Sequence, residues 1–412
     1  MSSTSLRIAV LDVVPGLLVD CAFYLDVFAL QFLVRGAGGS NLEVSLVYGV
    51  YTLAYGLLAP LLGRTTDRGD RRRVLRVAAL LFAAIPGGLA LLLEVGSGPG
   101  GLAVSTRLGL PVGPIGLIWA ASLAFALSNA LFWPALQARI GDRESDLAAR
   151  GRAIRRFNVG WTVGKALGPL LAGLVFVRAP AACLPLGAAM AAALLLVLLL
   201  DPPGAGRAAV SASPEAPRPE SVPQARRRAF LLAGLAANFA VWASMGALQL
   251  APTMAEALSI PADRVGTLLS LALAAQGAGF LALGGSRAWA YRPATLVAAA
   301  PAAALGLLLV LAARGFALAA VGAVVLGLAQ AVSYAASVFY SLDYDHRRGL
   351  RTGIHEATLA LAGGVSILGG LLADVTAQPR APLLVSLVPC AAIALVVAAL
   401  LLGAGARGEA RT

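Results

Sequence analysis

The sequence predicts an all-α membrane protein made of two pseudo-symmetric bundles of six helices around a central cavity. Hydrophobic residues occupy 59% of the 412 positions and charged residues only 13%, whereas about a quarter of the residues in a soluble domain are charged. Twelve apolar segments follow one another, each long enough to cross a hydrocarbon core about 30 Å thick. Backbone groups in lipid need partners within their own segment, so these segments should be helices.

The twelve segments divide into two sets of six. The first set, in an expected N-terminal bundle of residues 1–201, covers residues 6–34, 42–62, 73–94, 112–138, 154–177 and 180–200. Residues 202–227 are rich in Pro, Ala, Ser and Arg and should form a flexible cytoplasmic linker, because that composition cannot bury a core. The second set, in a C-terminal bundle of residues 228–412, covers residues 228–250, 263–285, 293–313, 315–341, 352–376 and 381–404.

The net charge of +12 reflects membrane orientation and does not indicate nucleic-acid binding. With the N-terminus inside, twenty-five of the thirty-one arginines fall on cytoplasmic segments and six outside, which is the positive-inside pattern. We therefore expect a multi-pass protein of a bacterial inner membrane, with both termini cytoplasmic. The first segment lacks a cleavage site and should be retained as a helix. Cys21, Cys183 and Cys390 lie in separate spans without metal-like spacing, so we expect neither a metal nor a cofactor.

An internal repeat relates the two bundles. A shift of 201 residues aligns LGPLLAG at position 167 with LGGLLAD at position 368. The same shift pairs Asn129 with Gln330, Trp133 with Tyr334, Asp142 with Asp343 and Arg150 with Arg351. Polar residues also concentrate in the first, fourth, seventh and tenth spans, and intramembrane polar groups normally face a bundle interior or a wet cavity. These four spans should therefore line the central cavity.

Two motifs carry a resemblance to a known family. The segment GRTTDRGDRRRVL, after the second span, is similar to the cytoplasmic signature of the major facilitator superfamily, although Thr65 and Asp70 depart from it. The matching residues are Gly63, Asp67, Arg68, Arg71 and Arg72. GWTVGKALGPLLAG, in the fifth span, resembles a motif of the family's antiporters. Here the matching residues are Gly160, Gly164, Gly168, Gly173 and Pro169.

The resemblance implies a secondary active transporter that moves a small-molecule substrate by alternating access. One half would rock against the other around a central site, coupled to protons or another ion, with efflux as the expected direction. We expect the chain to act as a monomer in the lipid bilayer. Asp67, Arg71 and Asp142 would form a cytoplasmic gate. Gly160, Gly164 and Gly168 recur every four residues, which makes a groove that a neighbouring helix can approach closely.

The only lysine marks the expected centre of the site. Thirty-one of the thirty-two basic residues are arginine, yet Lys165 lies near the middle of the fifth span. Lysine can lose its proton or change partners on burial, whereas a guanidinium stays charged. Asp20 lies at a similar depth in the first span. The pair could be a structural ion pair, or Asp20 could carry a coupling proton, or Lys165 could hold an anionic substrate. Neutral contacts should come from Tyr24, Asn129, Trp133, Asn238, Gln330 and Tyr334.

Two other classes of function compete with transport. A membrane-embedded enzyme is disfavoured, because only His346 and His355 are present and HEATL at position 355 lacks the second histidine of a zinc-binding HExxH helix. We interpret both histidines as gate or surface residues. A transport-inactive receptor, scaffold or lipid scramblase would share the fold. Costly polar groups in the central spans favour transport over that alternative.

Overall fold

The computed structural model describes residues 3–68, 70–98, 101–107, 109, 111–143, 147–200, 222–255, 257–284, 288–343 and 348–409. Within these ranges, 12 helices are long and apolar enough to cross a membrane, which confirms the expected fold class. The first half contains α1 (Ser3–Gly36), α2 (Asn41–Arg68), α3 (Arg71–Leu92), α4 (Pro114–Arg143), α5 (Leu147–Arg178) and α6 (Cys183–Leu199). The second half contains α7 (Gln224–Gln249), α9 (Ala262–Gly284), α10 (Pro293–Ala312), α11 (Phe316–Asp343), α12 (Arg348–Thr376) and α13 (Ala381–Glu409).

Three elements differ from the sequence-based expectation. A hairpin of β1 (Leu93–Gly98) and β2 (Gly101–Thr106) pairs antiparallel after α3, largely in the segment between the third and fourth expected spans, for which the sequence predicted no strand. Val95 and Val104 pack on the core of the first half, because alternate side chains of a strand share one face. The short helix α8 (Ala251–Met254) follows α7. α7 itself begins inside the segment expected as linker.

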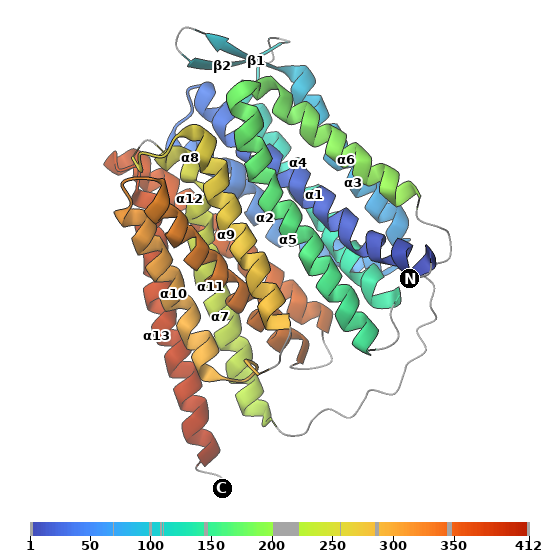
Figure 1. Ribbon diagram of the computed structural model, residues 1–412, viewed down its shortest axis with the longest axis vertical. Coiled ribbons are helices and arrows are strands. Elements are labelled where there is room, and N and C mark those ends of the chain that lie inside the picture. The colour runs from blue at the N-terminus through green and yellow to red at the C-terminus, as the bar shows by residue number, and fades with distance from the viewer. Residues whose placement is uncertain are drawn as a thin grey trace.

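The hairpin and the chain termini mark opposite ends of the helix bundle (Figure 1). We call these ends the hairpin side and the termini side. On the hairpin side α1 ends and α2 begins, while α2 ends and α3 begins on the termini side. Asp70 caps the start of α3 by accepting a hydrogen bond of 3.0 Å from the backbone N–H of Arg72. This capping role gives a local reason for aspartate at a position where the resembled signature has glycine.

Two helix pairs join the halves, α2 with α12 and α5 with α9. Glycines permit both approaches. A Cβ at Gly49 of α2 would come within 2.7 Å of Cδ1 of Ile367 in α12. A Cβ at Gly266 of α9 would overlap the carbonyl of Pro169 in α5. The apolar core of the second half continues across the α5–α9 junction to Leu25, Phe28 and Ala172 of the first half, which also has a core of its own.

The glycine stripe of α5 lies against α1. A Cβ at Gly160 or Gly164 would overlap the backbone carbonyl of Val13 or Leu17. At Gly168 it would come within 2.8 Å of a backbone carbonyl oxygen one turn further along α1. The two backbones therefore touch directly, and α1 and α5 hold the polar groups that they carry at a fixed separation.

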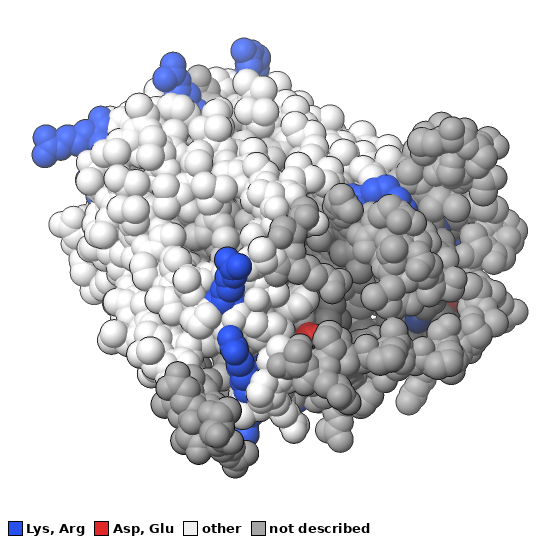
Figure 2. Space-filling model, turned by 60° about the horizontal axis from the view of Figure 1, so that its bottom comes forward, with Lys and Arg blue, Asp and Glu red and all other residues white. Residues whose placement is uncertain are grey.

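The outer surface is largely apolar. Large side chains such as Leu57, Leu91 and Leu395 are exposed, as suits helices that face lipid. Figure 2 turns the lower end of the molecule forward and shows isolated basic side chains on a mostly uncharged surface.

Candidate functional site

A cavity lies between the two halves, with about 650 Å³ of empty space including its open mouth. The first half contributes residues of α1, α2, α4 and α5, and the second half contributes residues of α7, α11 and α12. The cavity reaches the termini side, where the exposed Gln137 of α4 lies at its edge. The lining residues are Asp20, Tyr24, Tyr48, Thr52, Tyr55, Trp133, Gln137, Phe157, Trp161, Lys165, Trp242, Tyr334, Glu356, Leu359 and Ala360.

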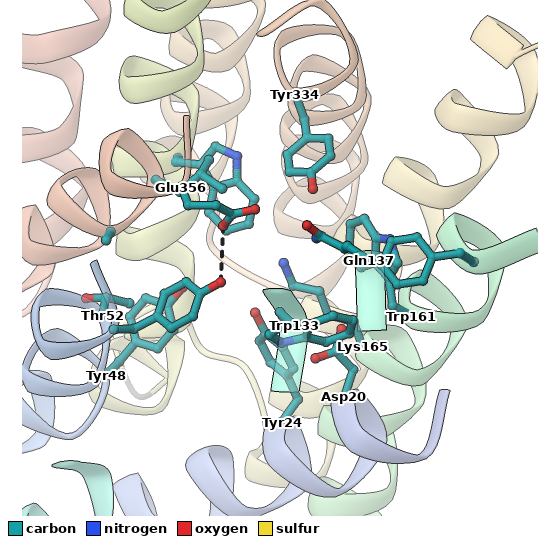
Figure 3. Close-up of a pocket in the computed structure, with 15 residues that line it drawn as sticks. Asp20, Tyr24, Tyr48, Thr52, Trp133, Gln137, Trp161, Lys165, Tyr334 and Glu356 are labelled. Carbon is teal, nitrogen blue, oxygen red and sulfur yellow. Dashed lines mark hydrogen bonds between the residues drawn. The ribbon is translucent and has the colours of Figure 1, made fainter. Parts of the chain in front are cut away.

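Two acidic side chains and one basic side chain meet in this cavity. Asp20 of α1 is 6% exposed and Lys165 of α5 is 3% exposed. Glu356 of α12 points into the same space from the opposite half, and Figure 3 shows it facing Lys165 across the cavity. Both carboxyl groups interact electrostatically with the Lys165 ammonium. The ammonium therefore lies between one acid of each half.

Aromatic rings surround the Lys165 ammonium. Its Nζ lies 4.4 Å from the ring centroid of Trp242, 5.0 Å from that of Tyr24 and 5.7 Å from that of Trp161. A cation within about 6 Å of a ring face is attracted by the ring quadrupole. We call these three residues the aromatic cage. Trp242 belongs to α7, so the cage joins Lys165 to the other half of the protein.

A second contact crosses the halves through Glu356. The hydroxyl of Tyr55 in α2 donates a hydrogen bond of 3.3 Å to the Glu356 carboxylate, the dashed line of Figure 3. The preceding residue, His355, is buried at 1% exposure, so its interpretation as a surface residue is wrong. Consecutive side chains of a helix are rotated by about 100° from each other, so the Glu356 side chain lines the cavity while that of His355 lies inside the second half. There its Nδ1 lies 2.8 Å from the hydroxyl of Ser337, and its ring contacts Tyr334.

The comparisons with known proteins identify the family. A family model described as Major Facilitator Superfamily matches residues 16–252, more than half of the chain. The chain belongs to this superfamily. No curated protein sequence matches it. The superfamily is one of transporters and typically not of enzymes.

Solved structures share the whole architecture. The nucleoside transporter NupG superposes with a TM-score of 0.67 at 14% identity, covering 97% of this chain and 99% of that one. A single-residue mutant of NupG gives 0.69 at 13% identity, covering 96% and 99%. A bacterial homologue of the human lysosomal transporter Spinster, inward-facing and unoccupied, gives 0.62 at 13% identity, covering 98% and 96%. At these identities the likeness establishes the fold alone.

The cavity contains five of the eight residues expected for the superfamily's central site, namely Asp20, Tyr24, Trp133, Lys165 and Tyr334. The other three lie elsewhere in this conformation. Asn129 supports Trp133, whose indole N–H donates a bond of 2.9 Å to the Asn129 amide oxygen. Asn238 and Gln330 are fully buried outside the cavity, and within the described residues their side-chain amides have no hydrogen-bond partner.

Sequence reasoning missed several cavity residues. Glu356 could have been found, because it is one of only two acids in the eleventh span. Trp242 follows Asn238 by one helical turn in a span already expected to be wet. Trp161 precedes Lys165 by one helical turn, a spacing that puts both side chains on one face of the fifth span. Tyr48 and Tyr55 of α2 carried no signal, since their span was not among those expected to line the cavity.

Part of the superfamily's cytoplasmic signature lies outside the described side chains. The backbone of Gly63, Asp67 and Arg68 continues α2, and that of Asp142 lies near the end of α4, but nothing is described of their side chains. Arg71 and Arg72 begin α3. The proposed gate of Asp67, Arg71 and Asp142 therefore stays a prediction.

The second half shows a contact at the position equivalent to Asp142. The repeat pairs Asp142 with Asp343, and the Asp343 carboxylate accepts a hydrogen bond of 2.5 Å from the hydroxyl of Tyr291. Tyr291 lies in the loop between α9 and α10, which is equivalent to the signature loop of the first half. Burial, followed by the bond to Asp343, raises the pKa of the Tyr291 hydroxyl above its ordinary value. By the internal symmetry, Asp142 should face the signature loop.

The hairpin side is closed by contacts between the same two halves. Asp374 of α12 accepts hydrogen bonds of 2.9 Å and 2.8 Å from the backbone N–H groups of Asn41 and Leu42, the first residues of α2. A carboxylate is well placed there, because the first N–H groups of a helix have no partner within it. The cavity is thus reached from the termini side and closed on the hairpin side.

One buried acid lies outside the cavity. Asp26 of α1 is 1% exposed and lies against Gly187 of α6. Neither of its carboxyl oxygens has a hydrogen-bond partner within the described part of the chain. Among the described residues, no three His, Cys, Asp or Glu side chains are arranged to hold a metal ion.

Proposed function

We propose that this chain is a secondary active transporter that exports a small solute across a bacterial inner membrane, coupled to protons. One observation carries the proposal: a cavity with charged groups from both halves is open on one side and closed on the other. That arrangement is one of the two end states that alternating access requires. The helix-5 motif, which resembles that of the superfamily's antiporters, favours export.

The open side corresponds to the cytoplasm in this proposal. The six arginines expected outside all lie at or near the hairpin-side ends of helices, whereas α6 ends, α7 begins and α2 meets α3 on the termini side. The positive-inside rule then favours a cytoplasmic location for both termini. Those six arginines are Arg35, Arg107, Arg178, Arg264, Arg314 and Arg380.

Asp20 carries the coupling proton in this mechanism, and Lys165 responds to it. An ionised Asp20 attracts the Lys165 ammonium, whereas a protonated Asp20 leaves it to the aromatic cage and to Glu356. Since Trp242 and Glu356 belong to the second half, loading a proton on Asp20 changes a contact between the halves. Protonation thereby biases the equilibrium between the two conformations, as a ligand does when it binds one state better than the other.

The experiment is transport in proteoliposomes. A solute is first identified by screening for compounds that raise the unfolding temperature of the purified protein. A ligand that binds only the folded state stabilises that state. Asp20→Asn should then abolish transport driven by a pH gradient while exchange of labelled for unlabelled solute persists. Lys165→Met should also lose pH-driven transport.

Asp26→Asn is the matched control, because it makes the same change on the same helix outside the cavity. It should transport like the wild type. Undiminished pH-driven transport by Asp20→Asn would reject the proposed coupling role. Lipid exchange between leaflets, without movement of any solute, would instead support the scramblase alternative.

A further inference from the structure

The site that the Lys165 ammonium occupies also suits the ammonium group of a ligand. Aromatic faces from both halves surround it, and the nearest is Trp242 at 4.4 Å. Aromatic cages of this kind also recognise ammonium groups of ligands. The lysine is attached through its own flexible side chain, so it can leave the cage without unfolding α5.

The formal charges of the cavity favour one more cation. Asp20 and Glu356 contribute two negative charges when ionised, and Lys165 contributes one positive charge. An unbalanced charge is costly where the charged side chains are buried, as Asp20 and Lys165 are at 6% and 3% exposure. A bound cation would bring the sum of the four charges to zero, whereas a bound anion would bring it to minus two.

The rest of the lining fits a ring. Eight of the fifteen lining side chains are aromatic, and they come from α1, α2, α4, α5, α7 and α11. The Trp242 indole N–H is buried and has no hydrogen-bond partner within the described part of the chain. Rings offer a planar solute stacking surfaces from both halves.

We propose that the cavity binds a ring-bearing organic cation whose ammonium takes the place of the Lys165 ammonium in the aromatic cage, while Lys165 turns to Asp20 and Glu356 faces the bound cation. Lys165 is then a built-in competitor of the substrate and not its anchor. This inference rests on the proposed function, since it names the substrate class of the same site.

The test uses three probes with one ring and different charges: phenethyltrimethylammonium, 2-phenylethanol and phenylacetate. Binding to the purified full-length protein is measured by tryptophan fluorescence and by the shift in unfolding temperature. The cation should bind and the alcohol and the anion should bind at least about tenfold more weakly, which corresponds to about 1.4 kcal/mol.

The variants separate competitor from anchor. Lys165→Met should bind the cation about tenfold more tightly, because the competing ammonium is gone. Lys165→Gln is a second variant in case the first does not fold, with the same gain expected. Arg178→Met removes a positive charge from the exposed end of α5, 13 positions beyond Lys165, and should leave affinity unchanged.

Two further variants test the partners of the cation. Glu356→Gln should weaken binding of the cation about tenfold, and Trp242→Leu should abolish it. Trp289→Leu is the matched control, because Trp289 packs on Phe339 away from the cavity.

Three outcomes would overturn the inference: tighter binding of the alcohol or the anion, weaker cation binding by Lys165→Met, or no binding of any probe by the wild type. Transport of adenosine, a neutral solute with a ring, distinguishes failure of this inference from failure of the proposed function. Transport of that neutral ring, driven by a pH gradient and lost in Asp20→Asn, would keep the proposed function and reject the cation.

Discussion

The Asp374 carboxylate, near the end of α12, accepts hydrogen bonds from both the backbone N–H and the side-chain amide of Asn41, at the start of α2. These bonds join the two halves across 333 positions of sequence. They lie on the hairpin side, opposite the mouth of the cavity, and must break if the cavity is to open there.

Asp374→Ala should therefore shift the population toward a state open on the hairpin side. Hydrogen bonds to a charged group contribute about 1.5–3 kcal/mol each, so losing the cap should raise the open fraction at least about tenfold. The measurement is thiol labelling from that side of Ser45→Cys, in a background whose three native cysteines are replaced. Glu94→Ala removes an exposed acid on the same side and should not change labelling. Equal labelling of all variants would contradict the role of Asp374.

The cytoplasmic gate predicts the opposite response. Asp67→Asn should weaken closure of the termini side and raise thiol labelling there of cysteines placed in α4 and α12. A solvated ion pair contributes only about 1 kcal/mol, so the population should shift without loss of fold. Asp70→Asn is the matched control, because it removes one charge three positions away in the same signature segment while asparagine still caps α3. Labelling that is unchanged in Asp67→Asn would reject the gate.

The contact between α1 and α5 makes a prediction about stability. Gly164→Ala should destabilise the protein by about 1–3 kcal/mol, because the added methyl group overlaps the Leu17 carbonyl. Gly88→Ala introduces the same group in α3, where no atom lies within 4 Å of the new Cβ. Thermal unfolding in detergent should separate the two variants. Similar unfolding temperatures for both would show that the close approach is not needed.

The bond between Tyr291 and Asp343 gives a stability that depends on pH. Because the folded-state pKa of Tyr291 is raised, its contribution is complete below the unfolded value of about 10 and is lost as the pH rises above that value. Tyr291→Phe should cost about 1 kcal/mol at pH 7, and its difference from the wild type should narrow above about pH 10. Unfolding curves at both pH values test this. A difference that stays constant with pH would mean that the hydroxyl does not titrate in this range, and no difference at pH 7 would mean that ring packing, and not the hydroxyl, stabilises the loop.

The span count, the fold class and the depth of Lys165 followed from sequence because they depend on local composition. A membrane span is visible in about twenty consecutive residues, and a single lysine among arginines is visible in a residue count. The glycine spacing of α5 is likewise local, although the sequence did not identify α1 as its partner. That pairing depends on the tertiary arrangement.

The aromatic cage and Glu356 depend on contacts that the sequence does not encode locally. Trp242 reaches Lys165 only because α7 and α5 face one cavity from different halves, 77 positions apart. Asn238 and Gln330 were expected in the cavity from polarity alone, yet helix rotation turns them into the interior of the second half. The hairpin escaped notice because its strands are six residues each and lie within a glycine-rich loop.

The two contacts between the halves differ in what can replace them. Between α2 and α12, the Asp374 carboxylate accepts a hydrogen bond from the first backbone N–H of α2 at one end, and the Glu356 carboxylate accepts one from the Tyr55 hydroxyl at the other. Water can replace each of these hydrogen bonds. Between α5 and α9, glycine meets a carbonyl and Trp161 meets Phe280, contacts for which water is a poor substitute. Close packing such as that of Gly49 on Ile367 holds the middle of the contact between α2 and α12. We therefore expect the halves to part first at the two polar ends of that contact, with α5 and α9 acting as the hinge. Hydration of one edge would then set the direction in which the molecule opens.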